Sequence, residues 1–530
     1  MTALALGETP SHRIYARSPE HLLRHHLFEG ASGSGKTSVA RECLAYLFRK
    51  RPEVPMLVLD GIGTLAADLA ARLYGWIERR EEAGADMRRM RSRILHLRVQ
   101  PENESGLSFD LAKLRPKIDA HGFPRFETVH ERVSAIMATL AHTTEGSEDY
   151  RLVHTYGSAA FAALVAGHRP VTELASVLTH GDEAYRVQLW IDIDRHGHRD
   201  AYVRAQLDVL NELYYTTQRS PVQFNVLTGS TRRNFAWLTQ EYASFFRRDS
   251  IDYGAFHSRG GVLLVDPADA NPTTAGIFRR ALYGIRNAFL ASRASNRPSL
   301  VVVDEQQGMN ADLYALHVAM ARNRSDYHWF LFQTGRQIGD RGAHYDEILS
   351  AMQHLVFFRP GTFESARQIA THLRRVSLTA ARLPTLTKTT SATWAAGMSG
   401  DNDMSSDDGA AGTVTGEERV RITEALDAHA LRLLELPIGT AYHIDPSARA
   451  IRVRHRYKTI NPEHRDLARE AHRIQFVRLH VEERFTPPVH AETAPPPVTD
   501  APQLPKTRKD RGRKDPKRRT AVDEGGETPA

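Results

Sequence analysis

Short apolar runs alternate with an amphipathic stretch in the first part of the chain. Met56–Asp60 and Ile94–Val99 are runs of strand length that are mostly apolar, as in parallel strands covered on both faces. Between them, apolar residues recur at helical spacing from Leu65 to Ile77, which is typical of a helix packed on one side. This order predicts a strand–helix–strand unit and hence a parallel sheet.

The strand pattern stops near residue 125 and returns after residue 248. Between these positions apolar residues keep helical spacing. Strands are predicted again at Val262–Asp266, Leu300–Asp304, Trp329–Gln333 and His354–Phe358, with helices at Ile277–Ser292 and Ala311–Arg322. We therefore predict an α/β protein in which one mainly parallel sheet is interrupted by an all-α domain.

The last third of the sequence divides into a loop, a return to the fold and a tail. Residues 385–416 are rich in Thr, Ser, Gly and Asp, so we expect a mobile loop that buries no core. A helix at Glu417–Leu434 and strands at Ala441–Ile444 and Ala450–Arg454 resume the fold. The predicted organisation is an N-terminal segment (1–23), a core in three parts (24–120, 256–384 and 417–485), an all-α insertion (121–255), the loop and a disordered tail (486–530).

The composition indicates two or three domains with a large core and no membrane segment. The chain has 530 residues, of which 41% are hydrophobic and 25% charged, and a mean hydropathy of −0.43. Its longest apolar stretches have strand length, and residues 1–13 lack the apolar segment of a secretory signal. The single cysteine, Cys43, cannot form an internal disulfide; we expect it to pack within a helix in a reducing cytoplasm.

The positive charge of the chain is concentrated in its tail. Nine Lys or Arg residues and two Asp residues lie between Gln503 and Thr520, a net charge of +7 that equals the formal net charge of the whole chain. Pro495–Pro497 separates this basic arm from the fold. Such an arm can bind nucleic acid without sequence preference, although a purely solubilising tail would have the same composition.

The clearest motif is the glycine-rich run Gly-Ala-Ser-Gly-Ser-Gly-Lys-Thr at residues 30–37. It follows the apolar pair Leu27-Phe28 and precedes a helix pattern at Ser38–Leu47, which is the strand–loop–helix order of a phosphate-binding (Walker A) loop rather than of a chance glycine-rich turn. Lys36 would reach the β- and γ-phosphates and the Thr37 hydroxyl would bind Mg²⁺. The residues expected to hold the nucleotide are Gly30, Ser32, Gly33, Ser34, Gly35, Lys36, Thr37 and Ser38.

A second motif supplies the carboxylates that nucleotide hydrolysis needs. The strand pattern at Leu300–Asp304 ends in Asp304 and is followed by Glu305. Asp304 would hold Mg²⁺, and Glu305 would polarise the attacking water. An ordinary strand followed by a polar turn would show the same letters, but the phosphate-binding loop makes the catalytic interpretation the better one.

Histidine is abundant, and His154, His196 and His198 raise the question of a metal site. No cysteine partner and no H-E-x-x-H spacing accompany them, so we interpret them as surface residues of helices.

Taken in order, these elements resemble the FtsK and HerA superfamily of hexameric DNA-pumping ATPases, and most closely the coupling proteins of conjugative type IV secretion systems. The similarity extends from about Leu27 to Arg456. It rests on Asp60 after an apolar run, on Ser108–Leu111 before the all-α insertion, and on a Leu-Pro-x-Gly segment within Glu435–Ala441. The resemblance implies a RecA-like P-loop NTPase core that hydrolyses ATP with Mg²⁺.

Two further site residues follow from the resemblance. Gln333 ends the strand after the Asp-Glu pair and would sense the γ-phosphate. Arg322, eleven residues earlier, resembles the arginine finger that reaches the nucleotide of a neighbouring subunit. Arg324 and Arg336 are alternative fingers, and Arg322 could instead end a helix and complement its dipole.

The resemblance also has departures. Coupling proteins usually carry membrane helices before the ATPase, and HerA-type enzymes a small β-barrel, whereas residues 1–23 alone precede the first predicted strand. We expect a cytoplasmic homo-hexamer that translocates DNA with low sequence specificity and reaches the inner membrane only through partners, such as a relaxase or secretion-system subunits. The alternatives are a HerA-like helicase of DNA-end processing and a recruitment module switched by nucleotide.

Overall fold

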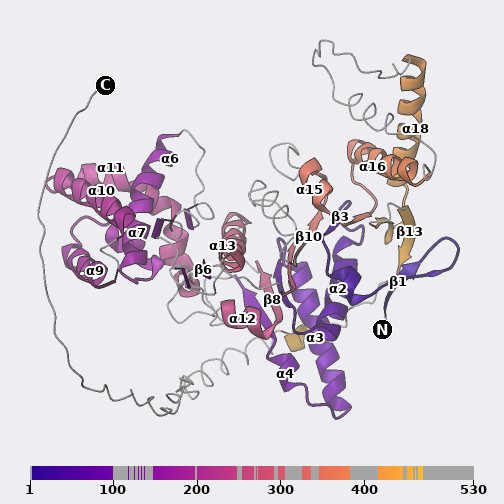
Figure 1. Cartoon of the computed structure of the whole chain (residues 1–530), viewed down its shortest axis with the longest axis horizontal. Helices are drawn as coiled ribbons and strands as arrows, with labels where there is room; N and C mark the ends of the chain where they lie inside the picture. The colour runs from indigo at the N-terminus through magenta and orange to yellow at the C-terminus, as the bar shows by residue number, and fades with distance from the viewer. Residues whose placement is uncertain are drawn as a thin grey trace, which may run out of the picture. The chain divides into compact units, whose positions relative to one another are not determined.

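The fold is built on one large sheet. A computed structural model describes residues 3–99, 147–196, 200–246, 253–267, 272–291, 297–304, 325–335, 345–381, 416–445, 450–456 and 463–468, with single positions and pairs between 117 and 137 and at 270 and 460 (Figure 1). In this part of the chain the main sheet has 11 strands in the order β2-β1-β13-β12-β11-β3-β10-β9-β4-β8-β5. The strand order, and the helices that join the strands, confirm the predicted α/β class.

The half of the sheet from β11 to β5 is parallel throughout. Its strands fall within one to three residues of the predicted ones: β3 (His26–Glu29), β4 (Pro55–Leu59), β5 (Ile94–Arg98), β8 (Gly261–Asp266), β9 (Ser299–Asp304), β10 (Asp326–Phe332) and β11 (His354–Phe357). Successive residues point to opposite faces, so Met56 and Val58 join one hydrophobic cluster while Leu57 and Leu59 join the other. Continuous apolar runs are therefore required, because both faces are covered.

Long helices cover both faces of this parallel half. α2 (Lys36–Lys50) and α3 (Thr64–Glu82) pack against each other and supply the cluster on one face (Figure 1). α13 (Pro272–Ala291), α15 (Tyr345–Ala351) and α16 (Phe363–Ala381) contribute to the cluster on the other face, and α16 packs on α18 (Gly416–Leu434). Shorter helices are α1 (Pro19–Leu22), α4 (Arg88–Arg91) and α12 (Tyr253–Arg259).

The other half of the sheet is antiparallel and contains two strands that the sequence analysis missed. β12 (Thr440–Ile444) and β13 (Ala450–His455) were predicted, but β1 (Leu4–Glu8) and β2 (Ile14–Arg17) extend the sheet beyond β13. Gly7 of β1 lies so close to the Arg454 carbonyl that a Cβ atom would clash with it. The N-terminal segment is therefore part of the sheet.

Between residues 147 and 259 the described part of the chain is helical, whereas the predicted all-α insertion (121–255) also includes the strand Pro124–Arg125. Its helical segments in the described residues are α6 (Glu148–Leu152), η1 (Val153–Gly157), α7 (Ser158–Ala166), η2 (Val171–Glu173), α8 (Leu174–Val177), α9 (Glu183–His196), α10 (Ala201–Thr217), α11 (Pro221–Asn234), η3 (Trp237–Glu241) and η4 (Ala243–Phe246). α7 is apolar all round and almost wholly buried, and it packs against α9 and α10. A two-stranded ribbon, β6 (Lys117–Ile118) and β7 (Pro124–Arg125), precedes these helices.

Several predictions lie outside the described residues. They are the segment Ser108–Leu111, the helix at Ala311–Arg322, residues 385–415 of the predicted loop and the basic tail; residue 416 already belongs to α18. Met1–His480 forms one compact unit, and the second unit, Val481–Ala530, is not described. Among the helices that are described, none combines the length and apolar character needed to cross a bilayer.

Candidate nucleotide-binding site

Three neighbouring strand tips bring the predicted site residues together. β10 lies between β3 and β9, and all three strands are parallel, so their carboxyl ends meet at one edge of the sheet. The phosphate loop follows β3, Gln333 follows β10 and Asp304 ends β9. The loop enters this edge directly, because the N–H of Gly30 donates to the Phe332 carbonyl at 3.2 Å.

The loop has the backbone shape that its glycines permit. Gly33 and Gly35 have φ angles of 71° and 111°, which residues with a side chain rarely adopt. Gly35 is the N-cap of α2, where no side chain caps the helix and no acidic residue lies in the first turn. The N-terminal end of α2, with its positive dipole, is therefore available to an anionic group.

Lys36 lies over the loop and is held by it. Its Nζ donates to the carbonyl oxygens of Gly30 at 2.6 Å and Ala31 at 2.9 Å, and only 5% of the residue is exposed. A buried ammonium group needs such acceptors, and phosphate oxygens would be stronger ones. The amine thus lies inside the curve of backbone that would wrap a phosphate.

Thr37 and Asp304 offer oxygen ligands to a cation. The Thr37 Oγ1 donates to Asp304 Oδ2 at 3.4 Å, joining the start of α2 to the tip of β9. A hydroxyl and a carboxylate are hard oxygen donors, which Mg²⁺ prefers, and Mg²⁺ usually keeps waters and substrate phosphates as its other ligands. The two side chains therefore fit the predicted Mg²⁺ site. When bound there, the ion would neutralise charge on the phosphates.

The three serines of the loop differ in environment. Ser32 is exposed and Ser38 is half-buried in the first turn of α2. The Oγ of Ser34 is buried without a hydrogen-bond partner, whereas its carbonyl oxygen accepts from the Gly439 N–H at 3.0 Å. An orphaned hydroxyl in a phosphate loop is consistent with a site that a polar ligand completes.

Glu29 is a site residue that the sequence analysis missed. It is completely buried at the end of β3, directly before Gly30. Its carboxylate accepts hydrogen bonds from the Tyr345 hydroxyl and from the Gly335 N–H, the latter at 3.1 Å. Burial raises the pKa of this carboxyl group to about 7, although Tyr345, Gly335 and the charge of Lys36 oppose the rise. The sequence did carry one sign of this role, because Glu29 is a charged residue at the last position of a buried strand.

Arg279 is a second residue that was missed. It lies on α13, is 3% exposed, and donates from a guanidinium nitrogen to the Asp304 carbonyl at 3.0 Å. This contact holds the main chain at the end of β9. Spacing within α13 gives no hint of it, because an arginine on a helix is ordinarily a surface residue.

The predicted catalytic residues are described only in part. Gln333 is half-buried at the tip of β10, next to the phosphate loop. Glu305 and Arg322 lie outside the described residues, as do Arg324 and Arg336, so their roles stay predictions.

Asp60, which carries part of the family resemblance, has a structural role. Its carboxylate accepts from the N–H groups of Ile62 at 3.0 Å, Gly63 at 2.9 Å and Ala66 at 2.7 Å, and so closes the turn into α3. Burial is the main cause that raises the pKa of Asp60, and the nearby Asp266 adds to it.

The histidines considered for a metal site make ring contacts. His154 packs on Tyr150 at 4.1 Å between ring centroids, and His196 stacks on His168 at 4.4 Å. His198 is outside the described residues, within which no group of three His, Cys, Asp or Glu residues could hold a metal ion.

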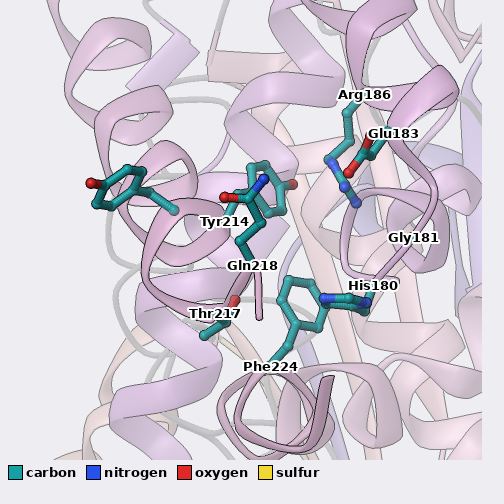
Figure 2. Close-up of a pocket in the computed structure, with 9 residues that line it drawn as sticks. His180, Gly181, Glu183, Arg186, Tyr214, Thr217, Gln218 and Phe224 are labelled. Carbon is teal, nitrogen blue, oxygen red and sulfur yellow. The ribbon is translucent and has the colours of Figure 1, made fainter. Parts of the chain in front are cut away.

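The all-α region has a pocket of its own, with a volume of about 260 Å³. Figure 2 shows Tyr214 and Thr217 of α10, with Gln218 just after it, along one wall, His180 and Arg186 on the facing one, and Phe224 of α11 below. The Arg186 guanidinium lies 4.4 Å from the Tyr214 ring centroid, and Phe224 stacks on Tyr214 at 6.1 Å. The helices around the pocket, α9, α10 and α11, also carry exposed apolar side chains: Val187, Ile191, Tyr215, Val222 and Val226.

Comparisons with known proteins support the fold. A search with protein-family models finds no match, and a search of curated protein sequences finds none. Among solved structures, the unbound bacterial conjugative coupling protein TrwB (TrwBdeltaN70) aligns with a TM-score of 0.51 at 14% identity, over 87% of this chain and 91% of TrwB. TrwB in complex with ADP and Mg²⁺ aligns with a TM-score of 0.50 at 13% identity and the same coverage. The chain therefore has the fold of a conjugative coupling protein, which confirms the predicted P-loop ATPase architecture.

Proposed function

We propose that this chain is an ATP-hydrolysing motor that translocates DNA, in the manner of the ATPase of a conjugative coupling protein. The observation that supports it most is the 3.4 Å approach of Thr37 Oγ1, at the start of α2, to Asp304 Oδ2, at the tip of β9, beside a buried Lys36. Phosphate loop, metal ligands and the tip of β10 then face one bound nucleotide.

Each residue has a separate task in this proposal. The backbone of Gly30–Gly35 and the Lys36 amine bind the phosphates, and Thr37 and Asp304 hold Mg²⁺. Glu305 accepts a proton from the attacking water, and Gln333 contacts the γ-phosphate. Arg279 holds the Asp304 carbonyl and thereby orients the start of the segment that carries Glu305.

The proposed motor function requires an oligomeric ring and a DNA-binding segment. We propose a homo-hexamer in which Arg322 of one subunit completes the nucleotide site of the next. The basic arm after Gln503 would hold DNA through phosphate contacts, without reading its sequence. Contact with the inner membrane would come through partners, such as a relaxase or subunits of a secretion system.

The test is the ATPase rate of the full chain against added DNA, measured across protein concentrations. A motor is expected to show DNA-stimulated turnover that rises faster than linearly with protein concentration as rings form. Lys36→Ala is the inactive control. Turnover that DNA does not change, in protein that forms rings, would contradict the motor and favour a nucleotide switch. A neighbouring nuclease gene, instead of secretion genes, would favour the HerA-like helicase.

One observation favours the recruitment alternative. The pocket between α9, α10 and α11 joins aromatic rings to Arg186 and is bordered by exposed apolar side chains, which is typical of a surface that binds a protein segment. Recruitment and pumping are compatible in one protein. An Arg186→Glu variant should keep DNA-stimulated ATPase activity but lose transfer of its cognate DNA; loss of both would indicate a damaged fold.

A further inference from the structure

Glu29 connects three parts of the nucleotide site. Its backbone leads directly into Gly30, its Oε1 accepts from the Gly335 N–H at 3.1 Å, and its Oε2 accepts from the Tyr345 hydroxyl. Gly335 is two residues after Gln333, and Phe332, just before Gln333, accepts from the Gly30 N–H. The turn that carries Gln333 is therefore attached to the phosphate strand on both sides, by the sheet on one and by Glu29 on the other.

The charges around this carboxylate depend on what occupies the loop. Lys36 is the cation that favours ionised Glu29, and its Nζ bonds to the loop carbonyls of Gly30 and Ala31. Tyr345 of α15 donates to Glu29, and the titratable groups next to this tyrosine are Asp346 and, on α16, His372, whose ring packs on Tyr345 at 6.0 Å. Bound MgADP would still add net negative charge, because Mg²⁺ neutralises only part of the charge of the phosphates. The phosphates would then compete with Glu29 for the positive charge of Lys36.

We propose that Glu29 is a positioning residue, which sets Gln333 relative to the phosphate loop and takes up a proton when nucleotide binds. The inference rests on the proposed function, since it requires that the loop bind nucleotide. Protonated Glu29 can still accept from the Gly335 N–H through its carbonyl oxygen, while its hydroxyl group can hydrogen-bond with the Tyr345 hydroxyl, so the turn stays attached while the negative charge is removed.

The direction of the effect follows from the pKa of Glu29. At about 7 before binding, the carboxyl is largely ionised at pH 7.5, and added negative charge raises the pKa further. Binding at pH 7.5 should then take up about half a proton, and affinity should weaken roughly fivefold between pH 6.5 and 8.

The experiment measures proton uptake with MgADP, which needs no turnover. Titration calorimetry of the full chain in two buffers of different ionisation enthalpy gives the number of protons bound per nucleotide. Wild type should take up about half a proton more than Glu29→Gln, which removes the titrating group. Glu42→Gln is the matched control: it makes the same change on α2, where Glu42 pairs with Arg41 and Arg72. It should match wild type.

Tyr345→Phe tests the same carboxyl without changing it. Loss of the hydroxyl removes a hydrogen bond that lowers the pKa of Glu29, so proton uptake should move to higher pH. Glu29→Ala, which removes the contacts to Gly335 and Tyr345, should lower kcat for ATP by at least several-fold with KM nearly unchanged, because Gln333 contacts only the γ-phosphate. Equal proton counts in wild type and Glu29→Gln, with MgADP bound by both, would overturn the inference and leave the proposed function standing. Failure of wild type to bind MgADP would refute both.

Discussion

The Gly439 N–H donates to the Ser34 carbonyl oxygen at 3.0 Å, although the two residues lie 405 positions apart. The Leu-Pro-x-Gly segment therefore holds the phosphate loop at Ser34, while the Phe332 and Arg359 carbonyls accept from the Gly30 and Ala31 N–H groups at its start. Gly439 has a φ of 78°, which explains the glycine at this turn. The nucleotide site is thus assembled from distant parts of the chain.

Lys36→Ala and Glu305→Gln should separate binding from hydrolysis. The first removes a phosphate contact and should abolish nucleotide binding or turnover. The second removes only the base, so binding should persist while hydrolysis stops. Equilibrium binding of a fluorescent nucleotide and phosphate release measure the two steps. Normal turnover in Glu305→Gln would disprove its role.

Arg322→Ala should lower turnover by orders of magnitude and leave ATP affinity nearly unchanged, because the finger acts on the transition state in a neighbour. Mixing this variant with Lys36→Ala should restore some hydrolysis, since one interface can then combine an intact loop with an intact arginine. The same mixing experiment, with Arg324→Ala or Arg336→Ala in place of Arg322→Ala, tests these two residues as alternative arginine fingers. Absence of rescue in rings shown to be mixed would mean that Arg322 does not act between subunits.

Truncation before Lys506 should weaken DNA binding without changing basal ATPase activity. The arm contributes through counterion release, so its loss should flatten the dependence of affinity on salt. DNA binding measured over a series of salt concentrations checks this. An unchanged slope would identify the arm as a solubilising tail.

Stability should depend on the protonation of Glu29. Its pKa in the folded protein, about 7, exceeds the ordinary value of 4.5, so the folded state binds the proton more tightly than the unfolded state. The resulting stabilisation, roughly 3 kcal/mol, is fully present below pH 4.5 and is lost as pH rises through 7. Thermal unfolding of Glu29→Gln between pH 5 and 8 should show a flatter profile than wild type. If the unfolding temperatures of wild type and Glu29→Gln changed with pH in parallel, protonation of Glu29 would not contribute to stability.

The buried pair of Arg286 and Asp326 should be important for stability. Arg286 is completely buried on α13 and donates to Asp326 at the start of β10, where Ser299 Oγ also donates at 2.7 Å. Arg286→Met should cost about 3–5 kcal/mol, because it leaves a buried carboxylate without its cation. The double variant with Asp326→Leu should recover much of the loss in thermal unfolding. An equal or larger loss in the double variant would mean that packing matters more than charge.

The sequence predicted the parallel half of the fold well because both faces of those strands are buried. Short runs of apolar β-branched residues such as Leu300–Val303 favour a strand that is buried on both faces. β1 was missed because it is a short strand next to the sheet edge with only two of its residues buried, and its partner β13 lies more than 400 residues later in the sequence. Strand pairing between distant segments leaves no local periodicity.

The site was predictable where it is local. The glycine-rich motif is continuous, so a loop between β3 and α2 could be predicted from its spacing alone, whereas the nucleotide contacts of its residues stay predictions. Glu29 and Arg279 act through contacts with Tyr345 and with the Asp304 carbonyl, far away in sequence, and no pattern within a window predicts such contacts. Tertiary contacts of this kind become visible only in the folded chain.

Strand β3 has both of its neighbours, β10 and β11, in residues beyond 325. During synthesis the ribosome releases the phosphate loop with the first tenth of the chain, yet the strand in front of it has nothing to pair with for roughly 15 to 60 s, at 5–20 residues per second. Nascent chains that stop before β10 would carry the complete loop sequence without a nucleotide pocket. On the proposed function, ATP could therefore bind and stabilise only chains whose translation has passed β11, about two thirds of the way along the sequence.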